Sequence, residues 1–300
     1  MLIWLVLIPL IAAALIGLCK APARPTALLS ASLTLALGIW ALVSFDGCSS
    51  CWSRFEGMDL QLTLAPALSK VMLLLTILVT FATVLGTNPP QGGEASWYNS
   101  ALLISAGATG AFLSDNIISF FAFHELALIP TFVMIGLYGR GDRRTTAWRA
   151  TLYLGLASMV LLAALLMIGT QAGFTFSGLK DFMASGRELA HAELIGALLI
   201  AGFGTLISLF PFHSWAAPAY ASAPAPVAMM HAGVLKKFGL YGLFMFQPLM
   251  ETGFLPWTNI LLVLLVCNVI WVGYVTVNQK RLDLLLGNSS VMHMGYIFLA

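Results

Sequence analysis

The stretch PFHSWAAPAYASAPAP, residues 211–226, decides how the fold of this chain is interpreted. It joins two strongly apolar runs and contains four prolines, including Pro211 and Pro224, but no aspartate, glutamate, lysine or arginine. Proline removes a backbone N–H donor and blocks the preceding helical turn, so the stretch predicts an interrupted helix. At membrane depth such a break is tolerated only where protein or water satisfies the freed carbonyl groups. Discontinuous helices mark ion sites in transporters. His213 is a candidate for binding freed carbonyls, and a structural role fits it equally well.

The regions on both sides of this stretch are also apolar. Of the 300 residues, 60% are hydrophobic and only 9% are charged, and the mean hydropathy is +0.93. A soluble globular domain carries about 25% charged residues, so this class is excluded. Intrinsic disorder and nucleic-acid binding are excluded as well, because both need high charge. The sequence therefore predicts a protein that resides in the lipid bilayer.

Several runs are long enough to cross that bilayer as helices. A spanning helix needs about 20 predominantly apolar residues, and about ten runs approach this length. The predicted spans are residues 1–19, 25–45, 66–87, 97–113, 117–138, 148–170, 194–210, 226–247, 258–278 and 282–300. Spanning strands are not expected, because the runs do not alternate between apolar and polar residues. The prediction is an all-α, polytopic membrane protein in which residues 171–193 form a surface loop with some helix.

The distribution of lysine and arginine predicts the orientation, because cytoplasmic loops are enriched in both residues. Alternate loops on one side hold eight of them: Lys20, Arg24, Arg140, Arg143, Arg144, Arg149, Lys280 and Arg281. The other side holds three: Arg54, Lys180 and Arg187. Eight against three places the first set in the cytoplasm and the N-terminus outside. The N-terminus is apolar and lacks a basic region, which favours an uncleaved span over a signal peptide.

Three ionisable residues fall well inside predicted spans. At 1.5 Å per residue, Glu125 lies about 12 Å from the start of its helix, and Lys236 and Lys237 lie about 15 Å into theirs. An ionisable group at this depth costs at least roughly 2.5–3.5 kcal/mol, so it normally faces protein or water and has a use. Burial disfavours the charged form of acid and base alike, which allows both to exchange protons near neutral pH. The alternative is an ion pair that only joins two helices, and function is favoured because such pairs are costly.

The residues beside these charges are weaker candidates. Adjacent helical residues point about 100° apart, so at most one of the two lysines faces a given partner, and Lys237 is preferred over Lys236. His231, six residues before Lys237, fits a relay and a packing role equally well. For His124, which directly precedes Glu125, a packing role is preferred.

The remaining polar residues receive structural interpretations. Lys70 lies near a helix end and is expected to extend its ammonium group to the interface. Asp115 and Asn116 are expected to cap the helix that follows them. His293 has no evident partner in the sequence.

The four cysteines do not form a disulfide scaffold in a chain of this length. Cys19 and Cys267 are expected to be small buried thiols. Cys48 and Cys51 lie in a loop assigned to the outside, where an oxidising compartment permits a local disulfide. The sequence contains no phosphate loop, dinucleotide fingerprint, nucleophile elbow or metal-ligand cluster, so we expect no metal site and no cofactor bound by this chain.

Five stretches together resemble a known family. They are SDNIISFFAFHELALIP (114–130), PFHSW (211–215), APAP (223–226), HAGVLKKFGLYG (231–242) and KRLDLLLGNSSVMHMG (280–295). In order and spacing they resemble the antiporter-like subunits of respiratory complex I. The M-type (mitochondrial subunit 4-like) proton-translocating subunit is the nearest type, and Mrp antiporter subunits are close relatives.

The resemblance implies an inverted repeat of five helices, with one broken helix and one half-channel in each repeat. It divides the chain into N-terminal helices (1–96), a first repeat (97–250) and the start of a second repeat (251–300) that continues beyond Ala300. The family's membrane glutamate matches Glu125, and its lysine after the proline-rich break matches Lys237. A histidine that L-type relatives carry matches His231.

Two departures from the family pattern affect the first half-channel. The family places a lysine seven residues before the histidine of its His-x-Trp motif, and here that position is Leu206. The family's Trp-Leu-Pro-Asp-Ala-His is replaced by the sequence from Trp215 to Tyr220, which lacks the acid and the second histidine.

The function that these features predict is proton translocation by a membrane subunit of an NADH–quinone oxidoreductase. The partners would be the other membrane subunits and the bilayer, and NADH, FMN, iron–sulfur centres and quinone would bind to partner subunits. The chain would be part of an enzyme without a redox site of its own. Two alternatives stay open: an Mrp-type cation/proton antiporter subunit and a non-conducting structural subunit.

Overall fold

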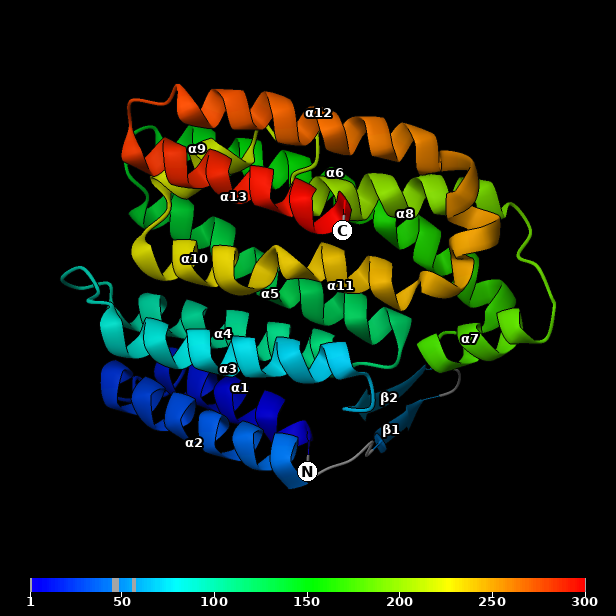
Figure 1. Ribbon diagram of the computed structural model, residues 1–300. Helices are drawn as coiled ribbons and strands as arrows, with labels where there is room; N and C mark the ends of the chain where they lie inside the picture. The colour runs from blue at the N-terminus through cyan, green and yellow to red at the C-terminus, as the bar shows by residue number, and fades with distance from the viewer. Residues whose placement is uncertain (1, 45–48, 56–57, 300) are drawn as a thin grey trace. The chain divides into compact units, whose positions relative to one another are not determined.

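The computed structural model describes residues 2–44, 49–55 and 58–299, and most of them are helical (Figure 1). The α-helices are α1 (Ile3–Gly17), α2 (Ala23–Ser44), α3 (Ala67–Gly86), α4 (Glu94–Leu113), α5 (Ile117–Tyr138), α6 (Arg143–Ala172), α7 (Phe176–Ala184), α8 (Ala192–Leu206), α9 (Ala216–Ser222), α10 (Ala225–Met230), α11 (Lys237–Met245), α12 (Thr258–Val277) and α13 (Leu282–Leu299). Short π and 3-10 helical turns accompany them: η1 (His231–Leu235), η2 (Gln247–Leu249), η3 (Met250–Phe254) and η4 (Leu255–Trp257). Every predicted span overlaps at least one of these helices, and α7 confirms some helix within residues 171–193.

Among the described residues, five helical stretches are long and apolar enough to cross a membrane. They are α2, α3, α5, α6 and the stretch Gln247–Val277, which ends with α12. The helices α1 and α8 are apolar but shorter, with 15 residues each. Since each long stretch reaches or exceeds the length of about 20 residues that a bilayer requires, the protein is an integral membrane protein.

One segment departs from the all-α prediction. The strands β1 (Ser49–Phe55) and β2 (Met58–Thr63) form an antiparallel hairpin between α2 and α3. From position 59 to position 64 the sequence alternates polar and apolar residues, and this period of two favours a strand over a helix. Leu62 and Leu64 are buried, so the hairpin and the residue that follows it supply apolar side chains to the core.

The cysteines agree only in part with the sequence predictions. Cys19 is exposed, so the expectation of a buried thiol was wrong there. The reason is its position just after the end of α1, beyond the packed part of the helix. Cys267 in α12 is half-buried. The disulfide that the sequence permits between Cys48 and Cys51 involves Cys48, which lies outside the described residues.

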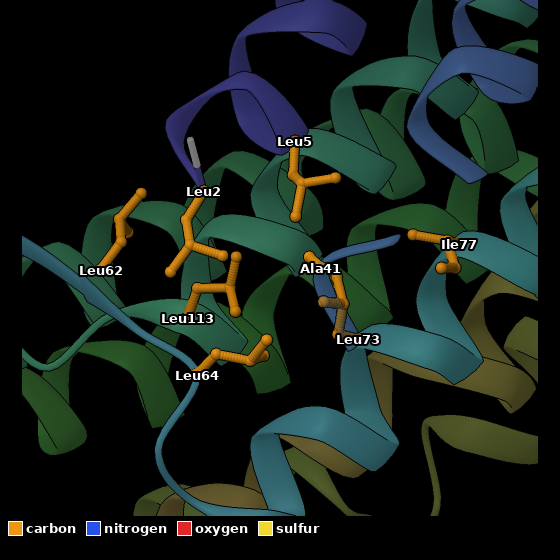
Figure 2. Packing of buried hydrophobic residues seen from close by; sticks show 8 residues of the cluster. All are labelled: Leu2, Leu5, Ala41, Leu62, Leu64, Leu73, Ile77 and Leu113. Carbon is orange, nitrogen blue, oxygen red and sulfur yellow. The ribbon is translucent and has the colours of Figure 1, made fainter. Parts of the chain in front are cut away.

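The chain divides into two compact units, and the first comprises Met1–Met134 and Pro224–Leu235. Within it, α1, α2 and α3 pack against α4. Figure 2 shows a cluster of buried apolar side chains where the end of the hairpin meets these helices: Leu2, Leu5, Ala41, Leu62, Leu64, Leu73, Ile77 and Leu113. Burying one leucine contributes about 1.5–3 kcal/mol, so the cluster is a main source of stability in this unit.

Two glycines of α4 determine how closely α5 approaches it. A Cβ atom at Gly107 would lie 2.6 Å from the carbonyl oxygen of Phe123, and one at Gly110 would lie 2.5 Å from the Phe123 ring. A larger residue at either position would therefore push α5 away. The close packing fixes the part of α5 that carries Glu125, two residues after Phe123.

The second unit comprises Ile135–Ala223 and Lys236–Ala300. In this unit α6 packs against α8, and α13 packs against both α9 and α12, which runs beside it in Figure 1. The contact between α13 and α9 depends on Gly287, where a Cβ atom would lie 2.9 Å from Cα of Ala217 and 3.2 Å from Cβ of Tyr220. The backbones of α13 and α9 therefore nearly touch.

Candidate ion-transfer site

The predicted interruption of the helix around residues 211–226 is confirmed. Helix α8 ends at Leu206, and residues 207–215 form turns before α9 begins at Ala216. A second break follows at Ala223 and Pro224, whose ψ angles of 140° and 155° are those of extended backbone, and α10 begins directly after them. Pro211 lies in the first break and Pro224 in the second, in agreement with the sequence prediction.

Protein groups satisfy the backbone that the first break releases. The backbone N–H of Phe210 donates a hydrogen bond of 3.0 Å to Oδ1 of Asn268 in α12. The side-chain N–H of Asn268 donates in turn to the carbonyl oxygen of Val291 in α13, at 3.1 Å. The indole N–H of Trp215 donates to the carbonyl oxygen of Thr205, at 3.2 Å. These bonds provide what a helix broken at membrane depth requires.

His213 lies in the first break and is half-buried. Its ring stacks on the ring of Phe210, with the centroids 5.5 Å apart and an angle of 22° between the planes. This contact fits the structural role that the sequence left open for His213.

Glu125 lies in α5 beside a buried histidine. Its Oε1 atom is 3.2 Å from Nδ1 of His124, and the exposed fractions of the two side chains are 31% and 1%. The ring of His124 is also near those of Phe120 and Phe121, each with a centroid distance of 6.5 Å. His124 is thus a packing residue, as predicted, and also a partner of the carboxylate. The amino-acid pattern does not indicate this pairing, because adjacent residues on a helix do not usually face each other.

His231 is buried and begins the π-helical turn η1. Gly233 in this turn lies against α3, where a Cβ atom would be 3.0 Å from Cγ2 of Val79. Single π turns inside helices occur frequently at functional sites. Nothing in the amino-acid pattern predicts such a turn, so a regular helix was expected here.

Lys236 and Lys237 differ strongly in burial. The side chain of Lys236 is 1% exposed, whereas that of Lys237 is half-buried. The Nζ atom of Lys236 donates a hydrogen bond of 3.3 Å to Oγ of Ser290 and lies 4.9 Å from the centre of the Tyr220 ring. From the sequence, Lys237 was the preferred functional base, and neither Tyr220 nor Ser290 was a candidate site residue.

Other sequence predictions concern helix ends and the position of the missing lysine. Asn116 caps α5 as predicted, because its Oδ1 accepts hydrogen bonds from the N–H groups of Ile118 and Ser119 at 2.9 and 3.0 Å. Lys70 is half-buried in the first turn of α3. Leu206 is buried at the end of α8.

His293 has a partner that the sequence did not reveal. Its Nδ1 atom lies 2.7 Å from the carbonyl oxygen of Ser289, one helical turn earlier in α13. No group of three or more His, Cys, Asp or Glu side chains that could hold a metal occurs in the part of the chain that the structure describes.

A set of membrane-crossing helices, a helix broken twice, and ionisable side chains inside the helices define the class of antiporter-like membrane proteins. Within this class, residues 114–300 match the model of the family described as "NADH:quinone oxidoreductase/Mrp antiporter, TM". The chain belongs to this family, which confirms the resemblance drawn from the motifs.

Individual relatives agree with this assignment. A protein of Microcystis aeruginosa named "NAD(P)H-quinone oxidoreductase chain 4 2" is 32% identical over 239 residues, which cover 77% of this chain and 42% of the relative. The chain spans less than half the length of the curated relatives it matches. A chain of respiratory complex I from Thermus thermophilus with bound NADH is similar in structure, with a TM-score of 0.86, 26% identity, and coverage of 98% of this chain and 63% of that one. A chain of the archaeal membrane-bound sulfane sulfur reductase shares the fold, with a TM-score of 0.88, 21% identity, and coverage of 100% and 64%.

Proposed function

We propose that this chain is a membrane subunit of an NADH–quinone oxidoreductase and that it translocates protons while partner subunits transfer electrons. The observation that carries the proposal is that α5 of this family member bears a carboxylate, Glu125, paired with a buried histidine in its interior. A carboxylate in this position is costly in a membrane unless it is used. The name of the Microcystis relative points to the same type of complex.

In this proposal Glu125 holds and releases a proton as neighbouring charge changes. The basic part of the pathway consists of His231, Lys236 and Lys237. Water molecules connect these side chains. NADH, flavin, iron–sulfur centres and quinone bind to partner subunits. The chain contributes to the enzyme as a translocating subunit.

The finer architecture is part of the same proposal. We place about ten helices across the bilayer: the five longer stretches, the helices α1, α4, α8 and α13, and residues 225–245, which contain α10 and α11. The N-terminus lies outside, in an energy-transducing membrane such as the bacterial plasma membrane. Residues 97–250 form the first five-helix repeat with its half-channel, after N-terminal helices in residues 1–96, and residues 251–300 begin the second repeat.

The test uses the complete complex that contains this chain, reconstituted in sealed vesicles. The Glu125→Gln variant keeps the size of the side chain and removes its ability to carry a charge. We expect the number of protons moved per NADH oxidised to fall, while Glu94→Gln, which changes an exposed carboxylate at the start of α4, leaves it unchanged. An unchanged ratio in Glu125→Gln would reject the proposal.

Two other functions follow from particular observations. The family description includes Mrp antiporters, so a cation/proton antiporter subunit is the first alternative, and copurifying subunits without electron-transfer centres would indicate it. The second is a non-conducting structural subunit, which the buried Leu206 in place of a lysine favours. An unchanged proton ratio in Glu125→Gln is the result that this second alternative predicts.

A further inference from the structure

Lys236 is the one lysine, arginine, aspartate or glutamate that is buried among the side chains that the structure describes. In the family resemblance the functional lysine is Lys237, and the proposed function includes Lys236 without saying which residues position it. An ammonium group that is removed from water must be compensated by its neighbours. The groups around Lys236 therefore indicate what this side chain does.

Two neighbours come from different helices of the same compact unit. Tyr220 belongs to α9, the short helix between the two breaks, and Ser290 belongs to α13. The ammonium lies over the face of the Tyr220 ring at 4.9 Å and donates a hydrogen bond of 3.3 Å to the Ser290 hydroxyl. The negative face of an aromatic ring attracts a cation at this distance.

The packing of α9 against α13 explains why these two side chains meet. Gly287 lets the backbones approach, since a Cβ atom there would lie only 3.2 Å from Cβ of Tyr220. Ser290 follows Gly287 by three residues, and residues three apart lie on the same face of a helix. The close contact at Gly287 therefore brings the Tyr220 ring and the Ser290 hydroxyl together, where both contact Lys236.

The chemistry of this site differs from that of an ion pair. Lys236 has no carboxylate partner in the described ranges 2–44, 49–55 and 58–299. A ring face and a hydroxyl stabilise the ammonium form but carry no full negative charge, so they do not hold the proton as tightly as a carboxylate would. Such a site can accept a proton and also give it up.

We propose that Lys236 is a proton-carrying group of this chain and that Tyr220 and Ser290 are the residues that position it. In the transfer, the ammonium Nζ gives one proton to a water molecule beside Ser290 and becomes a neutral amine. A proton from water on the other side restores the ammonium. This inference rests on the proposed function, and it adds a route beside Ser290 of α13.

The experiment varies the charge of the ring face at nearly constant size. Tyr220 is replaced in the reconstituted complex by phenylalanine and then by phenylalanine with one, two and three fluorine atoms, which progressively weaken the attraction for a cation. We expect Tyr220→Phe to retain most of the proton transport per NADH. Transport should then decrease stepwise with each fluorine, by roughly tenfold in total.

The matched control is the same fluorine series at Phe246, which is buried in the same unit against Phe176 and Phe203. Transport that stays constant along the Tyr220 series, or decreases equally along the Phe246 series, overturns the inference. Ser290→Ala should lower transport and Ser289→Ala should not. If Glu125→Gln abolishes transport while the Tyr220 series is flat, the proposed function stands and this inference fails; if both are without effect, the proposed function itself fails.

Discussion

The backbone N–H of Phe210 and the side chain of Asn268 form a 3.0 Å hydrogen bond across the first break in the helix. Asn268 is completely buried, and its other side-chain group binds the carbonyl oxygen of Val291. One amide thus joins the break to two further helices, α12 and α13. These two hydrogen bonds need a side chain with both a donor and an acceptor. Leucine has neither, and an ionised aspartate has only acceptors.

Asn268→Leu should therefore destabilise the protein. The change leaves the backbone N–H of Phe210 without its acceptor, at a cost of about 1–3 kcal/mol. It also removes the additional hydrogen bond to the carbonyl oxygen of Val291, which keeps its position in the helical hydrogen-bond pattern of α13. We expect a clear decrease in the Tm of the detergent-purified protein. Asn259→Leu in the first turn of the same helix changes an exposed residue and should leave the Tm nearly constant. Equal Tm values for the two variants would show that the bonds of Asn268 do not stabilise the break.

Gly287→Ala should separate α13 from α9. The added methyl group would lie 2.9 Å from Cα of Ala217, and overpacking of this kind costs about 1–3 kcal/mol. A suitable comparison is Gly155→Ala in α6, where no atom lies within 4 Å of the new methyl group. That change should be neutral or stabilise the helix by about 0.5–1 kcal/mol. Tm measurements on both variants check the difference, and a harmless Gly287→Ala would contradict the close packing.

His124→Phe should weaken proton transport less than Glu125→Gln does. The variant keeps a ring near Phe120 and Phe121 but removes the nitrogen that lies 3.2 Å from the carboxylate. Since Glu125 is about a third exposed, the contact contributes about 1 kcal/mol or less, which corresponds to at most about fivefold in rate. Initial rates of proton uptake in vesicles measure this effect. A rate equal to that of the unchanged complex would show that His124 has only a packing role.

The exposed Cys19 provides a test of orientation. In a variant in which Cys48, Cys51 and Cys267 are replaced by alanine, a membrane-impermeant maleimide can react only with Cys19 in this chain. Because Cys19 precedes Lys20 in a loop assigned to the cytoplasm, we expect labelling in inside-out vesicles and not in sealed right-side-out vesicles. The reverse result would place the N-terminus in the cytoplasm.

The sequence predicted the positions of the helices well, because long apolar runs and prolines act locally. The interruption between α8 and α10 was predicted from the four prolines of residues 211–226, through the donors that proline lacks. The hairpin was missed, since its alternation of apolar and polar residues extends over only a few positions. The turn η1 was missed because no residue type specifies a π-helical hydrogen-bond pattern.

The candidate site was predictable only in part. Glu125, Lys236 and Lys237 were visible as charges in apolar runs, which is a local property. The choice between two adjacent lysines depends on which side of the helix is covered, and this is set by residues more than 15 positions away in the sequence. Tyr220 and Ser290 belong to no motif with Lys236, and only the packing of α9 on α13 brings them to it.

Helix α4 illustrates how burial affects the composition of a membrane helix. Its side chains are buried on nearly every face, and glycine, alanine, serine and threonine are frequent in it. The five stretches that qualify as spans by length and hydropathy do not include α4. A helix enclosed by its neighbours needs small residues for close packing and has little contact with lipid tails. A hydropathy threshold therefore overlooks an enclosed helix of this composition, and a topology count that relies on hydropathy alone is too low for such a bundle.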